Sequence, residues 1–82
     1  MGYYGKVAKV FIENGFHGQI YTDDHEPPHV HIHKDGAEVV IALKNRDIIR
    51  NRKMKQKDIK IALALVEKHY NAILAKWEEF HG

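Results

Sequence analysis

The sequence predicts an α+β fold, in which an antiparallel meander of about four strands packs against one long C-terminal helix. Two observations predict it. Asn14-Gly15 and Asp35-Gly36 each separate two apolar segments, and these dipeptides favour the type I′ turn of a two-residue hairpin. From residue 55 onward, apolar side chains recur at spacings of three and four, which is typical of an amphipathic helix.

The first hairpin is expected to join a strand over residues 7–12 to a strand over residues 16–21. Asn14 and Gly15 tolerate the positive φ that a type I′ turn needs at both central positions. The polar residues 22–26 predict a loop after the second strand. Pro27 and Pro28 then favour extended backbone, and neither has an N–H group to donate within a central ladder.

The second hairpin joins residues 29–34 to residues 37–43, and its two-residue loop fixes the register of the strands. In that register His33 lies opposite Glu38, at a Cβ separation of about 5 Å. Because side chains alternate between the two faces of a strand, the histidines share one face. The other face is apolar and carries Val30, Ile32, Val39, Ile41 and Leu43.

A single domain is expected over residues 1–82, with a sheet over 1–43, a basic connector over 44–54 and a helix over 55–81. No Pro or Gly interrupts the helical segment, so one helix is the simplest prediction, and a break near residues 69–71 is the alternative. The apolar stripe that should cover the sheet consists of Ile59, Ala62, Leu63, Val66, Tyr70, Ile73, Leu74, Trp77 and Phe80.

The net charge of +2 hides an uneven distribution along the chain. Residues 1–43 carry −3, whereas residues 44–60 carry eight Lys or Arg against two Asp, for +6. Such a block suits a phosphate backbone or an acidic partner, although it is also typical of a solvated connector. The candidate nucleic-acid-binding residues are Arg46, Arg50, Arg52 and Lys53.

The composition excludes several classes of site. The chain contains no cysteine, so disulfides and thiolate metal sites are excluded, and a metal would need His, Asp or Glu ligands. The lack of disulfides fits the cytoplasm. No apolar run reaches transmembrane length, and residues 1–9 lack the apolar core of a signal peptide. We therefore expect a cytoplasmic protein without a membrane partner.

Four of the seven histidines lie between His25 and His33, and the first interpretation of this cluster is a metal site. Two histidines on one strand face with a single residue between them can chelate zinc, nickel or iron. His29 and His31 are such a pair, and His25, Asp24 or Glu38 are the alternatives that would complete the site.

The second interpretation is general acid–base catalysis on a phosphodiester. Cleavage of RNA needs a base for the 2′-hydroxyl and an acid for the leaving oxygen, and cationic side chains must offset the phosphate charge. The catalytic candidates are His25, His29 and His31, with Asp24, Pro27, Pro28, His33 and Glu38 as supporting residues. The third interpretation is a half-exposed polar strand face, on which His33 simply pairs with Glu38. His17 and His69 are interpreted as ordinary surface histidines.

The segment from Asp24 to Ile32, Asp-His-Glu-Pro-Pro-His-Val-His-Ile, resembles the signature of a bacterial family of short proteins, domain of unknown function 4160. The resemblance extends along the chain and includes the late Trp77 of the terminal helix. It implies a β-rich first half, an amphipathic helix, and a role in toxin–antitoxin modules, usually as the toxin. The positions of this sequence that match the family's motif are His25, Pro27, Pro28, His29 and His31, with Asp24. Relatives often have a Ser or Thr helix cap where this chain has Lys55.

These observations lead us to expect a toxin-like, RNA-directed protein, and an endoribonuclease if it is an enzyme. Its partners would be a small antitoxin-like protein and RNA. The alternative is a non-enzymatic module that binds zinc or nickel through His25, His29 and His31, and docks nucleic acid or an acidic partner. A third possibility is the neutralising or regulatory member of the pair. The edges of the hairpins also allow a homodimer.

Overall fold

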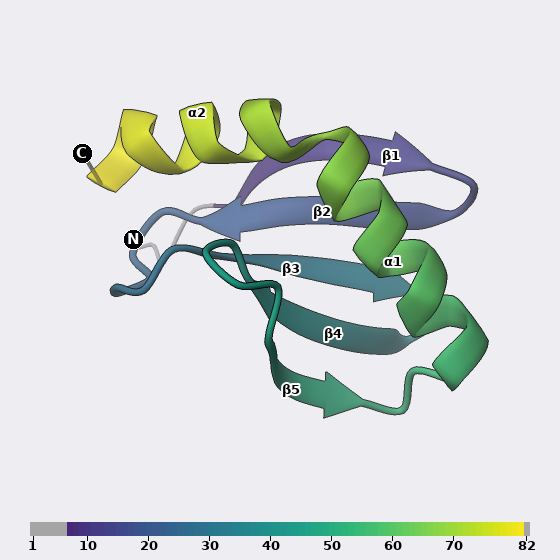
Figure 1. Ribbon diagram of the computed structural model, residues 1–82. Helices are drawn as coiled ribbons and strands as arrows, with labels where there is room; N and C mark the ends of the chain where they lie inside the picture. Colours follow the sequence, from purple (N-terminus) through teal and green to yellow (C-terminus); the bar gives the residue numbers. More distant parts are fainter. Residues whose placement is uncertain (1–6, 82) are drawn as a thin grey trace, which may run out of the picture.

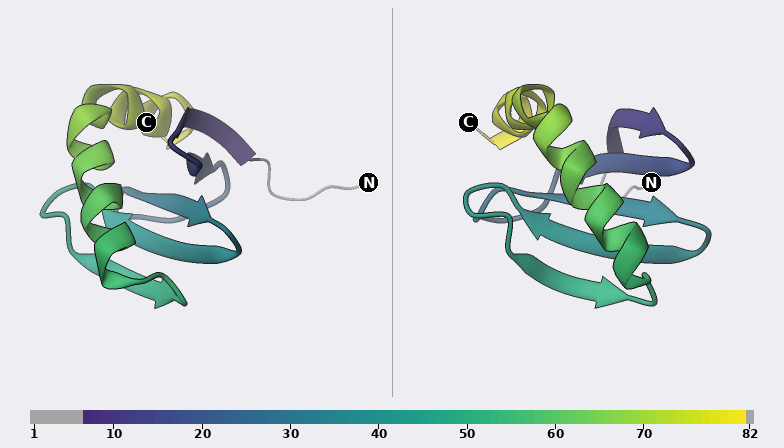
Figure 2. Two further views of the ribbon diagram at one scale, coloured as in Figure 1. Left: turned by 90° about the vertical axis from the view of Figure 1, so that its right-hand side faces the viewer. Right: turned by 45° about the vertical axis from the view of Figure 1, so that its right-hand side comes forward.

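The computed structural model describes residues 7–81, which form one antiparallel sheet and two helices (Figure 1). The elements are β1 (Val7–Glu13), β2 (Phe16–Tyr21), β3 (His29–Lys34), β4 (Ala37–Ala42), β5 (Ile48–Arg52), α1 (Gln56–Lys68) and α2 (Tyr70–His81). The strands follow one another in the sheet in the order β1-β2-β3-β4-β5. Both helices lie on the same face of this sheet, and no element of residues 7–81 covers the opposite face, called the open face below (Figures 1 and 2).

Both predicted hairpins are confirmed. Asn14 and Gly15 have φ values of 53° and 80°, and Asp35 and Gly36 have values of 49° and 83°. The predicted register of β3 against β4 is also confirmed, since His33 pairs with Glu38. Paired residues of an antiparallel sheet point to the same face, so this register decides which side chains can meet on the open face.

The prediction of about four strands is wrong by one, because the expected connector contains β5. This strand pairs antiparallel with β4, with Arg50 opposite Val40 and Arg52 opposite Glu38. All five residues of β5 are exposed, as suits a short, charged edge strand. Without an alternating apolar face it gives no strand periodicity, which explains why the pattern of the sequence did not reveal it.

The C-terminal segment forms two helices rather than one, and the break falls at His69, as the alternative prediction has it. His69 leaves helical geometry with φ −104° and ψ 16°. The chain enters α1 from Lys55 at the N-cap position, which provides no side-chain hydrogen bond to the helix. A straight helix over 55–81 would be about 40 Å long. The break instead turns α2 along the β1–β2 side of the sheet, as Figure 1 shows.

The apolar core lies between the helices and the sheet. Its most buried side chains include Phe16, Ile20, Val30, Ile32, Val39, Ile41, Ala62, Val66, Ile73 and Trp77. Lys9 and Phe11 are two positions apart and would face the same side of a regular strand. An irregularity between them puts them on opposite sides of the sheet, since Lys9 pairs with Gln19 and Phe11 pairs with Gly18. Phe11 thereby enters the core. Within residues 7–81, no helix is long and apolar enough to span a bilayer.

Candidate functional site

The candidate site lies on the open face of the sheet and begins with His31 at the centre of β3. Its ring stacks on Tyr21 of β2, with 4.2 Å between the ring centroids, and only 6% of the residue is exposed. Because His31 pairs with Gln19 on one side and Val40 on the other, its side chain has neighbours from both adjacent strands. This packing holds the imidazole in one orientation.

Asp24 brings the rings of His29 and His31 together. The loop after β2 turns back on itself, since the N–H group of Asp24 donates to the carbonyl of Tyr21 at 3.1 Å. The Oδ2 atom of Asp24 then lies 2.9 Å from Nε2 of His29 and 2.9 Å from Nε2 of His31. One potential ligand atom from each of the three residues lies within 4.8 Å of the other two.

The second nitrogen of each ring has its own acceptor. Nδ1 of His29 lies 2.7 Å from the carbonyl oxygen of Pro27, and Nδ1 of His31 lies 2.9 Å from Oε2 of Glu38. A carbonyl oxygen can only accept a hydrogen bond, so Nδ1 of His29 must carry the proton. In the neutral ring the Nε2 atom is then a lone-pair donor that points at Asp24.

Glu38 is a buried carboxylate surrounded by cationic groups. Its Oε2 atom also lies 3.5 Å from Nε2 of His33, and its Oε1 atom lies 3.5 Å from Arg50 and 4.0 Å from Arg52. Burial alone would raise the pKa of Glu38, but the hydrogen bond from His31 and the nearby positive charges outweigh it and hold that pKa below the usual value. Glu38 is therefore a charged acceptor for His31 at neutral pH.

A hollow of about 340 Å³ gives access to this group of residues. Asp24, His29 and His31 line it, together with His25, Glu26 and Arg50. An Arg beside a hollow with three potential metal ligands is suited to an anionic ligand, because its guanidinium group can neutralise phosphate or carboxylate charge.

The comparisons with known proteins place the chain in a family. A family model described as "Domain of unknown function (DUF4160)" matches residues 15–78, which is more than three quarters of the chain. The chain belongs to the DUF4160 family. No curated protein and no solved structure matches it significantly.

The family match covers the whole candidate site, and the structure brings together most of the predicted motif. His29, His31 and Asp24 meet directly, and Glu38 supports them from β4. His25 is exposed and lines the hollow. Pro27 contributes its carbonyl to His29, and the carbonyl of Pro28 accepts a hydrogen bond from the N–H group of Leu43 at 3.0 Å.

His33 lies at the margin of this group. Its Nε2 atom is buried without a hydrogen-bond partner, and burial is the main cause of its lowered pKa. Glu38 lies opposite His33 in the register, yet it approaches His31 more closely, because the side chain reaches diagonally across the strand pair. No pattern in the sequence indicates Tyr21, the stacking partner on the preceding strand.

The four basic residues proposed to bind nucleic acid do not lie in one group. Arg50 and Arg52 lie on the open face beside Glu38. Arg46 instead forms an ion pair with Glu67 of α1 at 2.5 Å and lies over the ring of Tyr70, 4.3 Å from its centroid. Lys53 lines a separate hollow with Lys34, Lys55 and Lys57. Only half of the predicted set therefore adjoins the histidines.

Proposed function

We propose that Asp24, His29 and His31 bind one divalent transition-metal ion, and that this DUF4160 protein is a metal-binding domain. One observation carries the proposal. The Pro27 carbonyl fixes the proton of His29 on Nδ1, so that a lone-pair nitrogen and a carboxylate oxygen lie 2.9 Å apart. These two atoms repel each other unless a proton lies between them, carried by the ring or by the carboxyl group, or a metal ion is bound by both.

The arrangement around the three ligand atoms supports the metal. Histidine ligands of metals usually donate their second N–H group to a carboxylate or a backbone carbonyl, which fixes the ring and makes it a better ligand. His31 has Glu38 in this role, and His29 has the Pro27 carbonyl. Imidazole nitrogen and carboxylate oxygen are ligands that suit zinc, nickel and iron, in agreement with the choice predicted from the sequence.

Three protein ligands leave coordination positions free, which is a property of catalytic metal sites rather than of structural ones. An ion bound there would supply Lewis-acid chemistry and would lower the pKa of a bound water molecule. The hollow beside the three residues gives a small ligand access to that position. Arg50 at its wall favours a ligand that carries negative charge.

Isothermal titration calorimetry with zinc chloride, and separately with nickel chloride, tests the proposal. We expect one ion per chain for the wild-type protein and no saturable binding for the Asp24→Asn, His29→Asn double variant. The matched control is His17→Asn, which removes an exposed histidine from the same face of the sheet. Binding that survives in the double variant, or is lost in the control, would contradict the proposal.

A second candidate function is metal-independent acid–base cleavage of RNA, as predicted from the sequence. The observation that favours it is that His25 and Arg50 line the same hollow as His29 and His31. If this function is correct, EDTA leaves the rate of RNA cleavage unchanged. A metal-dependent reaction would stop when EDTA removes the ion. In the toxin role that the family resemblance implies, His29→Ala or His31→Ala would abolish growth inhibition while the fold persists.

A further inference from the structure

We infer that the open face of the sheet binds single-stranded nucleic acid, which crosses the strands from β1 to β5 and passes the Asp24–His29–His31 group. The inference deepens the proposed function, since it names the ligand that would approach the metal. The binding itself depends on the sheet and not on an ion, and it can be measured without one.

The register of the five strands places two rows of side chains side by side on this face. The first row runs from β1 to β5 through Lys9, Gln19, His31, Val40 and Arg50. The second runs through Ile12, His17, His33, Glu38 and Arg52. Neighbouring strands lie about 4.8 Å apart, so each row is about 19 Å long, and the two rows are about 7 Å apart.

Cationic side chains outnumber acidic ones along these two rows. Both rows end in an arginine on β5, and the first begins with a lysine on β1. Among these ten positions Glu38 is the single carboxylate, and it is engaged by His31 and Arg50. Arg50, Arg52 and Lys9 are all exposed. Cationic groups at both ends of a polar face suit a polyanion that lies across it.

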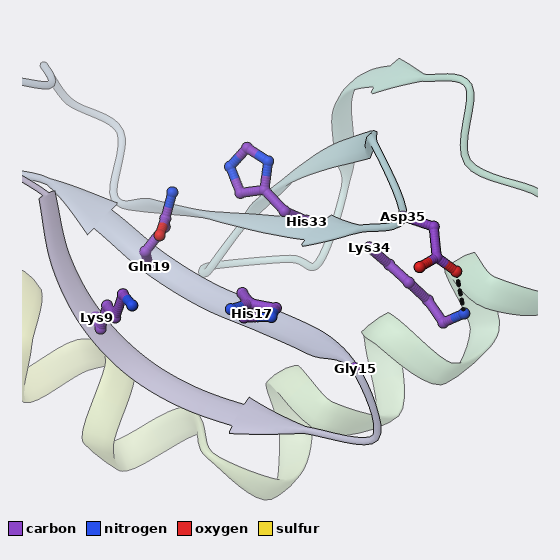
Figure 3. A pocket seen from close by; sticks show the side chains of 7 residues that line it. All are labelled: Lys9, Gly15, His17, Gln19, His33, Lys34 and Asp35. Carbon is purple, nitrogen blue, oxygen red and sulfur yellow. Dashed lines mark hydrogen bonds and ion pairs between the residues drawn. The ribbon is translucent and has the colours of Figure 1, made fainter.

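A second hollow, of about 550 Å³, lies on the β1–β3 part of the face. Figure 3 shows that Lys9, His17, Gln19 and His33 project from the same side of the sheet around it, with the helices behind. His33 lines this hollow, and His31 lines the hollow beside Arg50. Both histidines lie on the same face of β3, so the two hollows are adjacent. The face therefore offers two adjacent recesses, one with Arg50 beside Asp24 and Glu26, and the other with Lys9 and Lys34 beside Asp35.

The chemistry of the recesses favours a nucleic acid with unpaired bases over an acidic protein. Planar side chains, histidine among them, stack on bases that are splayed out of a single strand, and basic groups then hold the backbone. His17 is exposed and planar, and Gln19 beside it can donate and accept hydrogen bonds at a base edge. A duplex hides the faces of its bases and would leave these groups without a partner.

Fluorescence anisotropy with a labelled oligouridylate of about ten nucleotides tests the inference, a length within the range of sites on small single-strand-binding folds. The assay contains EDTA, so it is independent of the metal. The wild-type protein should bind the single strand in preference to a duplex of the same length. The logarithm of its binding constant should fall linearly with the logarithm of salt concentration, by a slope of about 0.7 for each phosphate contact.

Two charge-matched double variants decide whether the contacts lie on this face. Arg50→Gln with Arg52→Gln should lower the salt slope by about 1.4, the value for two phosphate contacts. Lys57→Gln with Lys60→Gln removes the same charge from α1, which lies on the other side of the sheet, and should leave the slope unchanged. Lys9→Gln with His17→Gln should also weaken binding, since it alters the β1–β2 end of the open face. Circular dichroism checks that each variant folds.

Equal slopes for the two double variants would overturn the inference, and so would equal affinity for duplex and single strand or no binding at low salt. Failure here is distinguishable from failure of the metal proposal. Zinc binding without nucleic-acid binding would overturn only the inference. Nucleic-acid binding in EDTA, together with no zinc binding by calorimetry, would overturn only the proposed metal function.

Discussion

The chemistry of the site depends on His31, because both of its ring nitrogens face carboxylates. Nε2 lies 2.9 Å from Asp24 and Nδ1 lies 2.9 Å from Glu38. The surroundings of Glu38 keep that residue ionised, so its contact with Nδ1 is a charge-assisted hydrogen bond. This bond leaves Nε2 to face Asp24 and His29. Glu38 is thus a positioning residue that does not itself touch the proposed ion.

Glu38→Gln tests this role. Loss of such a hydrogen-bond partner typically weakens metal affinity by about 10–100-fold, and we expect a decrease of that size for zinc. The measurement is a competition titration of zinc against a chromogenic chelator. The control is Glu26→Gln, which removes an exposed carboxylate at the same hollow and should leave affinity unchanged. If Glu38→Gln binds zinc as tightly as the wild type, Glu38 does not position His31.

At the scale of elements, Glu13 attaches the first hairpin to the junction of the two helices. It lies at the end of β1, where Lys68 donates to its Oε2 at 2.7 Å and Nε2 of His69 donates to its Oε1 at 2.9 Å. The ring of His69 also stacks on Phe11, with 4.5 Å between centroids. Since His69 is the residue at which the helices separate, these contacts fix the angle at which α2 leaves α1.

Glu13→Gln should make the stability of the protein less sensitive to acid. The hydrogen bonds from Lys68 and His69 lower the pKa of Glu13 below its ordinary value of 4.5. A carboxylate with a lowered pKa stabilises the fold at neutral pH, and this contribution is lost as the pH falls through the folded-state pKa. We therefore expect the variant to melt below the wild type at pH 7, and the gap to be smaller at pH 3, where more of the Glu13 carboxylate is protonated.

Thermal unfolding followed by circular dichroism at the two pH values measures this gap. Glu78→Gln, which removes an exposed carboxylate from α2, is the control and should melt like the wild type at pH 7. A gap of the same size at pH 7 and pH 3 would show that Glu13 acts through packing and not through its charge.

The elements that the sequence predicts well are those determined by local chemistry. The turns at Asn14-Gly15 and Asp35-Gly36 depend on two residues each, and together with alternation they fix two hairpins. β5 depends instead on the free edge of β4, which no local pattern of Ile48-Ile49-Arg50-Asn51-Arg52 reveals. The break at His69 likewise follows from tertiary contacts, since the segment contains no helix-breaking residue there.

The candidate site, too, could be predicted from the sequence only where local spacing decides it. The spacing of His29 and His31 predicts a pair of ring ligands, but it does not decide whether His25, Asp24 or Glu38 completes the set. That choice depends on the turn from Tyr21 to Asp24, which directs the Asp24 carboxylate toward the rings. The segregation of Arg46 from Arg50 and Arg52 depends on the strand β5, so the charge of the block alone could not show it.

At the scale of the whole molecule, the two faces of the sheet have separate roles. The helices cover one face and bury the apolar core, so the stability of the fold does not require the other face to be apolar. The open face collects Asp24, His31 and Glu38 near its centre and cationic residues on the outer strands. Substitutions on the open face should therefore leave the apolar core in place.

Histidine imidazole NMR spectra recorded during a titration with zinc test the central claim most directly. We predict that the Nε2 signals of His29 and His31 shift together and stop shifting at one equivalent, while both Nδ1 atoms stay protonated and His17 and His69 do not move. Shifts without saturation, or saturation on histidines other than this pair, would contradict the assignment of Asp24, His29 and His31 as a metal site.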